Sequence, residues 1–219
     1  MLFFKILIII LGITYITDSI YGRKLINIYE CWGIFGKPGS GKTTLLCKYA
    51  YKHLKRGWKV YADFGTNISG IQQFDDNDLK SGKWLPDGRP NNENILVIID
   101  EIGTLYNNRD FKTNFSNPDV LRWWKEHRHR HVKIIYCSQF YKDMDSKIRP
   151  LTDRYYICKR AFLNCISYAK PILTSIDITN SENSDNAGGQ IIDIYKYGFI
   201  TSWQFILLPR WIHKFNSFA

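Results

Sequence analysis

The residues from Gly36 to Thr43 carry the clearest chemical signal in this chain. They read G-K-P-G-S-G-K-T, which matches the spacing G-x-x-x-x-G-K-T of a phosphate-binding loop. Glycines let backbone N–H groups approach phosphate oxygens, Lys42 adds a positive charge, and the Thr43 hydroxyl is a ligand for Mg²⁺. The loop therefore predicts a site for ATP and Mg²⁺, whose expected nucleotide contacts are Gly36, Lys37, Pro38, Gly39, Ser40, Gly41, Lys42, Thr43 and Thr44.

Two acids follow an apolar run farther along the chain. Residues 94–99 read N-I-L-V-I-I and are followed by Asp100 and Glu101. A continuous apolar run of this length is typical of a parallel strand buried on both faces. An isolated pair of acids could be a solvated turn, but beside a phosphate-binding loop we expect Asp100 to hold Mg²⁺ together with Thr43. Glu101 would then polarise the attacking water and, with Lys42, act in catalysis.

Alternating strands and helices must position these groups. Apolar runs predict strands at residues 27–35, 57–64, 94–99 and 132–137. Helical spacing predicts helices at residues 44–56 and 119–130. This order predicts an α/β protein with the P-loop NTPase fold: a mostly parallel central sheet, helices on both faces and a small β-rich C-terminal extension. Ligands bind where parallel strands end, so the loop should converge there with Asp63, Asp100, Glu101 and Gln139.

Two segments between these elements are expected to lack helices and strands. Residues 67–74 read as a turn that leads into a solvated acidic loop, and residues 80–93 as a connection without periodicity. Pro118 suits the first turn of the helix at 119–130, which should direct Val120, Leu121 and Trp124 inward.

Length and composition limit the number of domains and the class of partner. With 219 residues, the chain has room for a single main domain with appendages. We place a hydrophobic membrane-anchor candidate at residues 1–22, the ATPase domain at 23–172, and a C-terminal extension with a polar linker and an apolar segment at 173–219. The net charge of +10 favours an anionic partner, nucleic acid or a phospholipid surface. The five cysteines lack metal-binding spacing and read as reduced thiols, although Cys158 and Cys165 could face each other in a hairpin.

The N-terminal residues allow three interpretations. They are apolar apart from Lys5 and Thr14 and are barely long enough to span a bilayer. A cleaved signal peptide would separate the site from ATP, and a buried strand is a further alternative. We favour an uncleaved anchor, because Arg23 and Lys24 would hold the following domain in the cytoplasm. The apolar residues 197–211 are interrupted by Pro209, which favours an interfacial contact or a docking strand.

Three blocks of sequence resemble one family. They are G-K-P-G-S-G-K-T-T at 36–44, V-I-I-D-E-I at 97–102 and W-K-E-H-R-H-R-H-V-K-I-I-Y-C-S-Q at 124–139. Together they resemble the zonula occludens toxin (Zot) family, the assembly ATPases of filamentous phages within the FtsK–HerA group of P-loop ATPases. The resemblance covers residues 27 to 170.

The resemblance implies several properties that the residues alone do not. Gln139 would be a catalytic sensor near the γ-phosphate. The chain would form a homo-oligomeric ring at the host inner membrane, with its ATPase domain in the cytoplasm. ATP hydrolysis there would drive virion assembly and extrusion, with phage coat or secretion-pore proteins as partners. Members of the family more often carry their membrane span after the ATPase domain, whereas here the stronger candidate is N-terminal.

A basic segment precedes the strand at 132–137. His127, His129 and His131 alternate with Arg128 and Arg130, a spacing that does not suit metal binding on one helical face. We interpret the segment, with Arg122, Lys125 and Lys133, as a basic patch beside the nucleotide site that could contact nucleic acid, anionic lipid or a neighbouring subunit's phosphate. The candidates for an arginine finger acting in a ring are Arg128, Arg130, Arg149 and Arg154.

Three other functions remain open from the sequence. A viral ATPase that packages or translocates DNA would use the positive charge in a DNA channel. A membrane-interacting protein could retain the loop only for structure. The sequence gives less support to a small-molecule kinase, because it shows no signature of a pocket for an acceptor substrate or of a lid.

Overall fold

The computed structural model describes residues 28–107, 109, 114–161, 166–175, 190–193, 204–207 and 214. The strands are β1 (Cys31–Phe35), β2 (Lys59–Ala62), β3 (Ile71–Gln73), β4 (Ile95–Ile99), β5 (Val132–Ser138), β6 (Arg154–Ala161), β7 (Ile166–Ser175), β8 (Gln190–Asp193) and β9 (Gln204–Leu207). The helices are α2 (Lys42–Leu54), α3 (Asp76–Ser81), α4 (Ile102–Leu105) and α5 (Pro118–Glu126), with 3₁₀ turns η1 (Arg89–Asn91), η3 (Tyr141–Asp143) and η4 (Arg149–Leu151).

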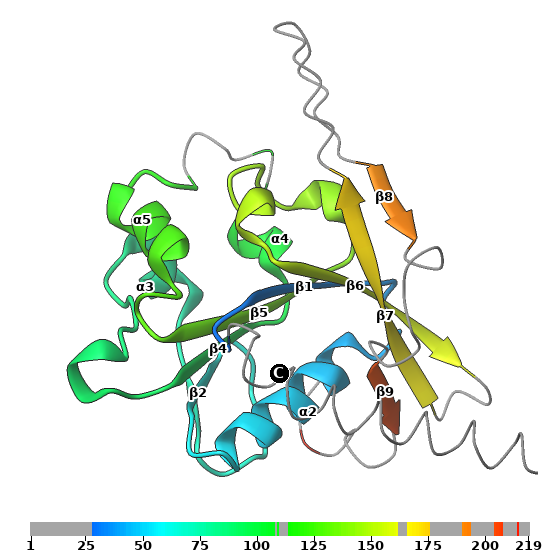
Figure 1. The fold of residues 1–219 in the computed structure, drawn as a ribbon, viewed down its shortest axis with the longest axis horizontal. Helices are drawn as coiled ribbons and strands as arrows, with labels where there is room; N and C mark the ends of the chain where they lie inside the picture. Colours follow the sequence, from blue (N-terminus) through cyan, green and yellow to red (C-terminus); the bar gives the residue numbers. More distant parts are fainter. Residues whose placement is uncertain are drawn as a thin grey trace, which may run out of the picture.

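The strands form one sheet in the order β3-β2-β4-β5-β1-β6-β7-β8 (Figure 1). From β3 to β6 every neighbouring pair is parallel, so these strands end at the same edge. β7 runs antiparallel to β6, and both β8 and β9 pair with β7. The expected mostly parallel sheet with a small β-rich extension is confirmed.

Helix α2 covers one face of the sheet (Figure 1). It buries Leu45, Leu46 and Ala50 against strand residues such as Ile34 and Ile98. Full burial of one such leucine is worth about 1.5–3 kcal/mol. This packing fixes the first turn of α2, and with it the end of the phosphate-binding loop.

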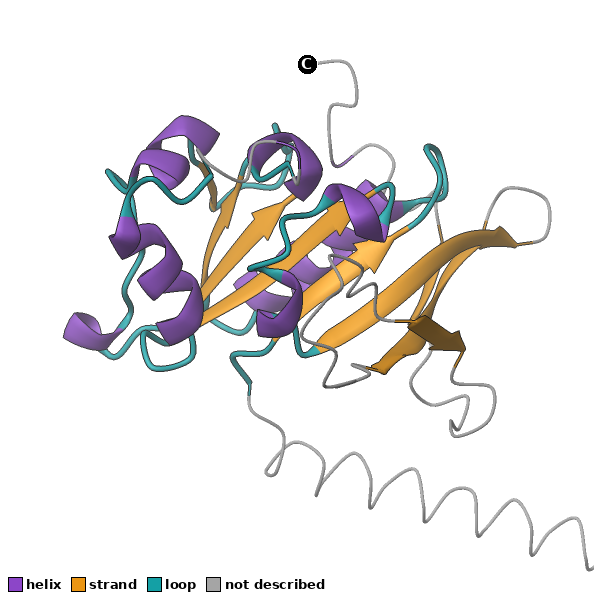
Figure 2. Ribbon diagram, turned by 90° about the horizontal axis from the view of Figure 1, so that it is seen from above, coloured by secondary structure: helices purple, strands orange, loops and turns teal. Residues whose placement is uncertain are grey.

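Helices α3, α4 and α5 cover the opposite face (Figure 2). Trp123 and Trp124 of α5 and Ile102 of α4 are buried against Val97 and Ile134 of the sheet. Helices therefore lie on both faces, as the alternating pattern predicts.

Two segments expected to be irregular form regular structure. Within the expected turn at 67–74, Ile71 to Gln73 form β3, a short parallel edge strand beside β2. The expected acidic loop is the helix α3, because the Asp75 carboxylate caps it by accepting from the Asn77 N–H at 2.8 Å. Leu79 then anchors α3 in the core.

Helix α5 is shorter than expected, and it buries a different set of residues. It ends at Glu126, not at residue 130, and His131 beyond it has a left-handed φ of 57°. Val120, Trp123 and Trp124 are buried, whereas Leu121 is only partly buried. Positions i, i+3 and i+4 share one helical face, and the Trp123 indole N–H also donates to the Pro86 carbonyl at 2.9 Å.

Of the C-terminal part, the structure describes residues 166–175, 190–193, 204–207 and 214. Within the apolar residues 197–211, Gln204 to Leu207 form β9 and pair with β7, in agreement with a docking strand. The membrane-anchor candidate at 1–22, Cys165, and the linker residues 176–189 lie outside the described residues. Among the described residues, no helix is long and apolar enough to cross a membrane.

Candidate functional site

The phosphate-binding loop connects the end of β1 to the start of α2. Gly39 and Gly41 have φ values of 73° and 96°, a region that L side chains rarely adopt. At Gly36 the limit is space, because a Cβ there would lie 2.6 Å from the Cys158 carbonyl oxygen and 2.6 Å from Ser40 Oγ. Glycine is therefore required at Gly39 and Gly41 for the backbone conformation, and at Gly36 for the lack of a side chain.

Lys42 lies in the first turn of α2 and reaches back over the loop. Its Nζ donates to the carbonyl of Gly36 at 2.7 Å and to that of Lys37 at 3.3 Å. The side chain is 9% exposed, so its charge is held inside the loop and not in solvent. Thr44, in the same turn, is also buried.

Thr43 faces the end of β4. Its hydroxyl lies 3.0 Å from each carboxylate oxygen of Asp100. Asp100 is positioned in turn by Asp63 at the end of β2, whose carboxylate accepts from the Asp100 backbone N–H at 2.9 and 3.0 Å. The two acids thus form a chain of contacts from β2 through β4 to the loop.

Burial dominates the electrostatics of this pair. It raises the pKa of Asp100, although the Thr43 hydroxyl and Lys42 oppose the rise. The pKa of Asp63 rises to about 8, first through burial and then through the charge of Asp76. A cation bound at Asp100 would favour the ionised carboxylate, because it supplies the charge that the buried site lacks.

Glu101 lies beside the end of β5. Its Oε1 accepts from the Ser138 hydroxyl at 3.0 Å, and the Gln139 backbone N–H also stabilises its ionised form. Burial nevertheless raises the pKa of Glu101. A half-buried carboxylate with a raised pKa, adjacent to Asp100, is suited to accept a proton from water.

A cavity of about 650 Å³ opens beside the phosphate-binding loop. It is lined by the loop from Phe35 to Ser40, by Gln139, and by residues 157–160 of β6. Gln139 is exposed, so its amide can reach a ligand in the cavity. A few polar groups set among apolar ones are typical of a small-molecule site.

The donor set fits a magnesium–nucleotide complex. Thr43 and Asp100 offer oxygen ligands, which Mg²⁺ prefers, at the end of a loop whose glycines leave room for phosphate. Ser40 Oγ is buried at the same loop without a hydrogen-bond partner among the described residues, so it too is available to a ligand. Thr43 and Asp100 would hold the metal ion, and the loop would hold the phosphates.

All the residues expected at the site lie at one edge of the sheet. The loop from Gly36 to Thr44, Asp100, Glu101 and Gln139 come together there. The contact of Ser138 with Glu101 was not among the expectations from the sequence. The signal for Ser138 was register: Ile99 pairs with Tyr136, so the residues two beyond each, Glu101 and Ser138, lie side by side.

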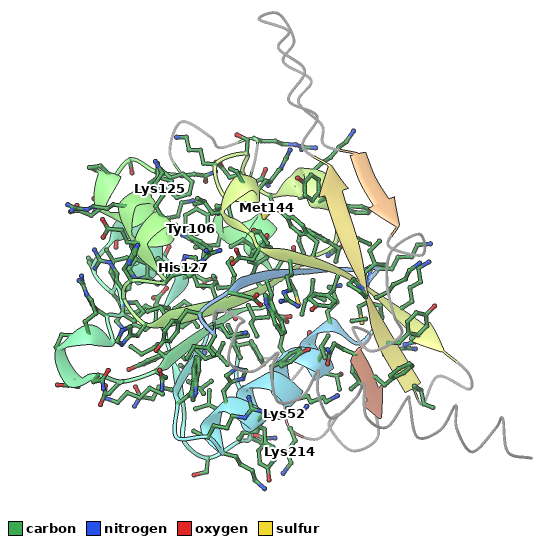
Figure 3. All side chains as sticks on the ribbon, in the orientation of Figure 1. Lys52, Tyr106, Lys125, His127, Met144 and Lys214 are labelled. Carbon is green, nitrogen blue, oxygen red and sulfur yellow. The ribbon has the colours of Figure 1, made fainter. Side chains whose placement is uncertain are left out.

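The basic patch lies at the opposite edge of the sheet, which corrects its expected place beside the nucleotide site. It precedes Val132, whereas Glu101 contacts Ser138 at the other end of β5. With about 3.3 Å per residue, this seven-residue strand separates the two by about 20 Å. Figure 3 labels Lys125 and His127 on and just after α5, and His127 is buried with its Nδ1 2.8 Å from the Trp124 carbonyl.

The four candidate finger arginines all contact groups of this chain. Arg128 pairs with Asp153, Arg130 with Asp87 and Glu126, and Arg154 with Glu30. Arg149 donates to the carbonyls of Lys142 and Met144. A role in another subunit would require each of them to exchange these partners.

Comparison with known proteins gives the following matches. A family model described as "Zonular occludens toxin (Zot)" matches residues 34–197. No curated protein matches the chain. The N-terminal domain of zonular occludens toxin from Neisseria meningitidis is 21% identical, with 65% of this chain and 82% of that chain covered and a TM-score of 0.48.

Two further solved structures are similar. The genome packaging NTPase B204 from Sulfolobus turreted icosahedral virus 2, in complex with ATP-gammaS, is 16% identical over 62% of this chain and 77% of that chain, with a TM-score of 0.47. A solved structure described as an ATPase domain is 12% identical over 87% of this chain and 85% of that chain, with a TM-score of 0.50. At this identity the last match is one of fold, and it agrees with the P-loop NTPase architecture described above.

Proposed function

The chain belongs to the zonular occludens toxin (Zot) family, and from that premise we propose that it is a membrane-associated P-loop ATPase that powers assembly and extrusion of filamentous phage virions. The observation that carries the ATPase part is the contact of Thr43 with Asp100. It joins the phosphate-binding loop to the acidic end of β4 within 3.0 Å. Membership of the Zot family supports the part of the proposal that concerns virion assembly.

The hydrolysis step follows from the chain's own groups. Lys42 and the loop N–H groups bind the phosphates of ATP, and Thr43 and Asp100 hold the metal ion. Mg²⁺, when bound, supplies positive charge to the phosphate oxygens. The Glu101 carboxylate accepts a proton from water, and the water oxygen bonds to the γ-phosphorus as the bond to the bridging oxygen breaks. Gln139, in the cavity, would sense the loss of the γ-phosphate.

The proposal includes location and partners. Residues 1–22 would anchor the chain at the host inner membrane, with the ATPase domain in the cytoplasm. A homo-oligomeric ring and contacts with coat or secretion-pore proteins complete the proposed machine. The support is the apolar N-terminal sequence followed by Arg23 and Lys24.

Net charge favours a second candidate function. A charge of +10 suits a DNA channel, as in a viral ATPase that packages or translocates DNA. Stimulation of ATP hydrolysis by double-stranded DNA at physiological salt would favour this candidate. Hydrolysis that DNA leaves unchanged favours the extrusion ATPase.

Steady-state ATP hydrolysis of the full chain tests the enzymatic part. Lys42→Ala should reduce hydrolysis at least about 100-fold, because it removes the cation held in the loop. Lys52→Ala is the matched control: it removes an exposed lysine from the last turn of the same helix and should leave the rate unchanged. Equal rates in wild type and Lys42→Ala would contradict the proposal.

Fractionation of expressing cells tests the location. The full chain should sediment with membranes, and a chain that lacks residues 1–22 should remain in the supernatant. If both versions remain in the supernatant, the anchor is wrong, and the ATPase proposal is judged by the hydrolysis assay alone.

A further inference from the structure

Strand β6 extends past the point where β1 turns into the phosphate-binding loop. Phe35, the last residue of β1, pairs with Ile157, and β6 continues to Ala161. The residues after Ile157 therefore run beside the loop. At about 3.3 Å per residue, they follow it for about 10 Å.

This overhang contacts the loop at two points. The Cys158 thiol donates to the Ser40 carbonyl at 3.2 Å, and the Cys158 backbone closes over Gly36. Arg160 lies two residues farther along and so projects from the same face of the strand. Its Nη2 is 3.4 Å from the position that a Cβ would take on Gly39, which places the guanidinium directly over the loop.

Arg160 also differs from the arginines considered above in its partners. Arg128, Arg130 and Arg154 each pair with a carboxylate of this chain. Arg160 is exposed, and within the described ranges no acidic side chain pairs with it. Its charge is therefore available to a ligand.

The cavity beside the loop has the character of a site for a polyanion. Lys37, Lys159 and Arg160 line it, and among the residues that the structure describes no acidic side chain does. Phe35 and Ile157 add apolar surface to the same walls. Its volume of about 650 Å³ lies within the range of about 300–1,000 Å³ that is usual for small-molecule sites.

We propose that Arg160 binds the polyphosphate of the nucleotide from the outer side of the loop, in the same subunit, and that the cavity between the loop and β6 holds the rest of the nucleotide. The inference rests on the proposed nucleotide-binding function. The planar guanidinium presents several N–H donors to phosphate oxygens, which a single ammonium group cannot match. The base would lie against the apolar walls.

Equilibrium binding to the full chain tests the proposal, with two probes. The first is Mg·ATP, and the second is inorganic tripolyphosphate, which has no base or ribose. Arg160→Ala should bind both probes about tenfold more weakly, the loss expected for one charge-assisted hydrogen bond. Arg160→Lys should recover only part of the affinity, because it keeps the charge but not the planar donor group.

Arg56→Ala is the matched control. It removes the same charge from an exposed arginine after α2, far from the loop, and should leave both affinities unchanged. Unchanged ATP affinity in Arg160→Ala would overturn the proposal. A loss for ATP without a loss for tripolyphosphate would also overturn it, because the contact would then be with the nucleoside.

Failure of the underlying function gives a different result. If wild type does not bind Mg·ATP, or binds it as well as Lys42→Ala does, the nucleotide site itself is wrong. If Lys42→Ala weakens binding and Arg160→Ala does not, only the role of Arg160 is wrong.

Discussion

Glu101 depends on a neighbouring hydroxyl for its ability to accept a proton. Burial raises the pKa of this carboxyl, and the hydrogen bond from Ser138 is the largest effect that lowers it. The sequence identified Glu101 because an acid pair follows a buried strand. It could not identify Ser138, because the direction of a hydroxyl depends on the register of two strands that are distant in sequence.

The pH dependence of hydrolysis tests this pairing. A base works only when it is ionised, so the single-turnover rate should fall as the pH falls through the raised pKa of Glu101. Ser138→Ala removes the stabilising hydrogen bond and should shift this acid limb upward by about half to one pH unit. Ser69→Ala, which alters an exposed serine, should leave the limb in place. An identical limb in Ser138→Ala and wild type would contradict the pairing.

The order and lengths of elements decide where each motif acts. The sequence pattern predicted the strands that carry the loop and the acids, because long apolar runs leave little choice of structure. It missed β3 and α3, since Ile71 to Gln73 are mostly polar and α3 depends on a single cap at Asp75. The basic patch was assigned to the wrong edge, although residues that precede a parallel strand lie at the edge opposite its end.

The close contact between β6 and the loop predicts the effect of one methyl group. Gly36→Ala would place a Cβ 2.6 Å from the Cys158 carbonyl oxygen, so the loop must move away from β6. We expect ATP affinity to fall at least about tenfold. Gly65→Ala is the control, because nothing lies within 4 Å of a Cβ there. Wild-type affinity in Gly36→Ala would show that the loop is not held as described.

At the scale of the whole molecule, the sheet separates two charged regions. The nucleotide site lies at the C-terminal edge of the parallel strands, and the basic patch lies at the other edge. The fold class, and the convergence of the expected site residues at one edge of the sheet, were predictable because alternating strands and helices bring the strand ends together. The distance between the basic patch and the nucleotide site depends on the length and direction of β5. The positions of charged residues in the sequence do not give either.

The pH dependence of the free energy of unfolding should reflect the raised pKa of Asp63. Its pKa rises from 3.8 to about 8 on folding, so the folded state retains a proton that the unfolded chain releases between these values. The free energy of unfolding should therefore decrease as the pH rises through this range. Asp63→Asn keeps an acceptor for the Asp100 N–H but cannot titrate. The free energy of unfolding of this variant should therefore decrease less than that of wild type as the pH rises.

Chemical denaturation of the nucleotide-free protein at a series of pH values measures this difference. The wild-type curve should converge on or fall below that of Asp63→Asn as the pH increases. Parallel curves for the two proteins would show that Asp63 is ionised in the folded state.

ATP binding and hydrolysis by Glu101→Gln, measured on the same preparation, test the central claim most directly. The glutamine preserves the shape of the side chain but cannot accept a proton, so the variant should bind Mg·ATP with wild-type affinity and hydrolyse it at least about 100-fold more slowly. Hydrolysis at the wild-type rate would show that the chemistry does not take place between the phosphate-binding loop and the acids that follow β4.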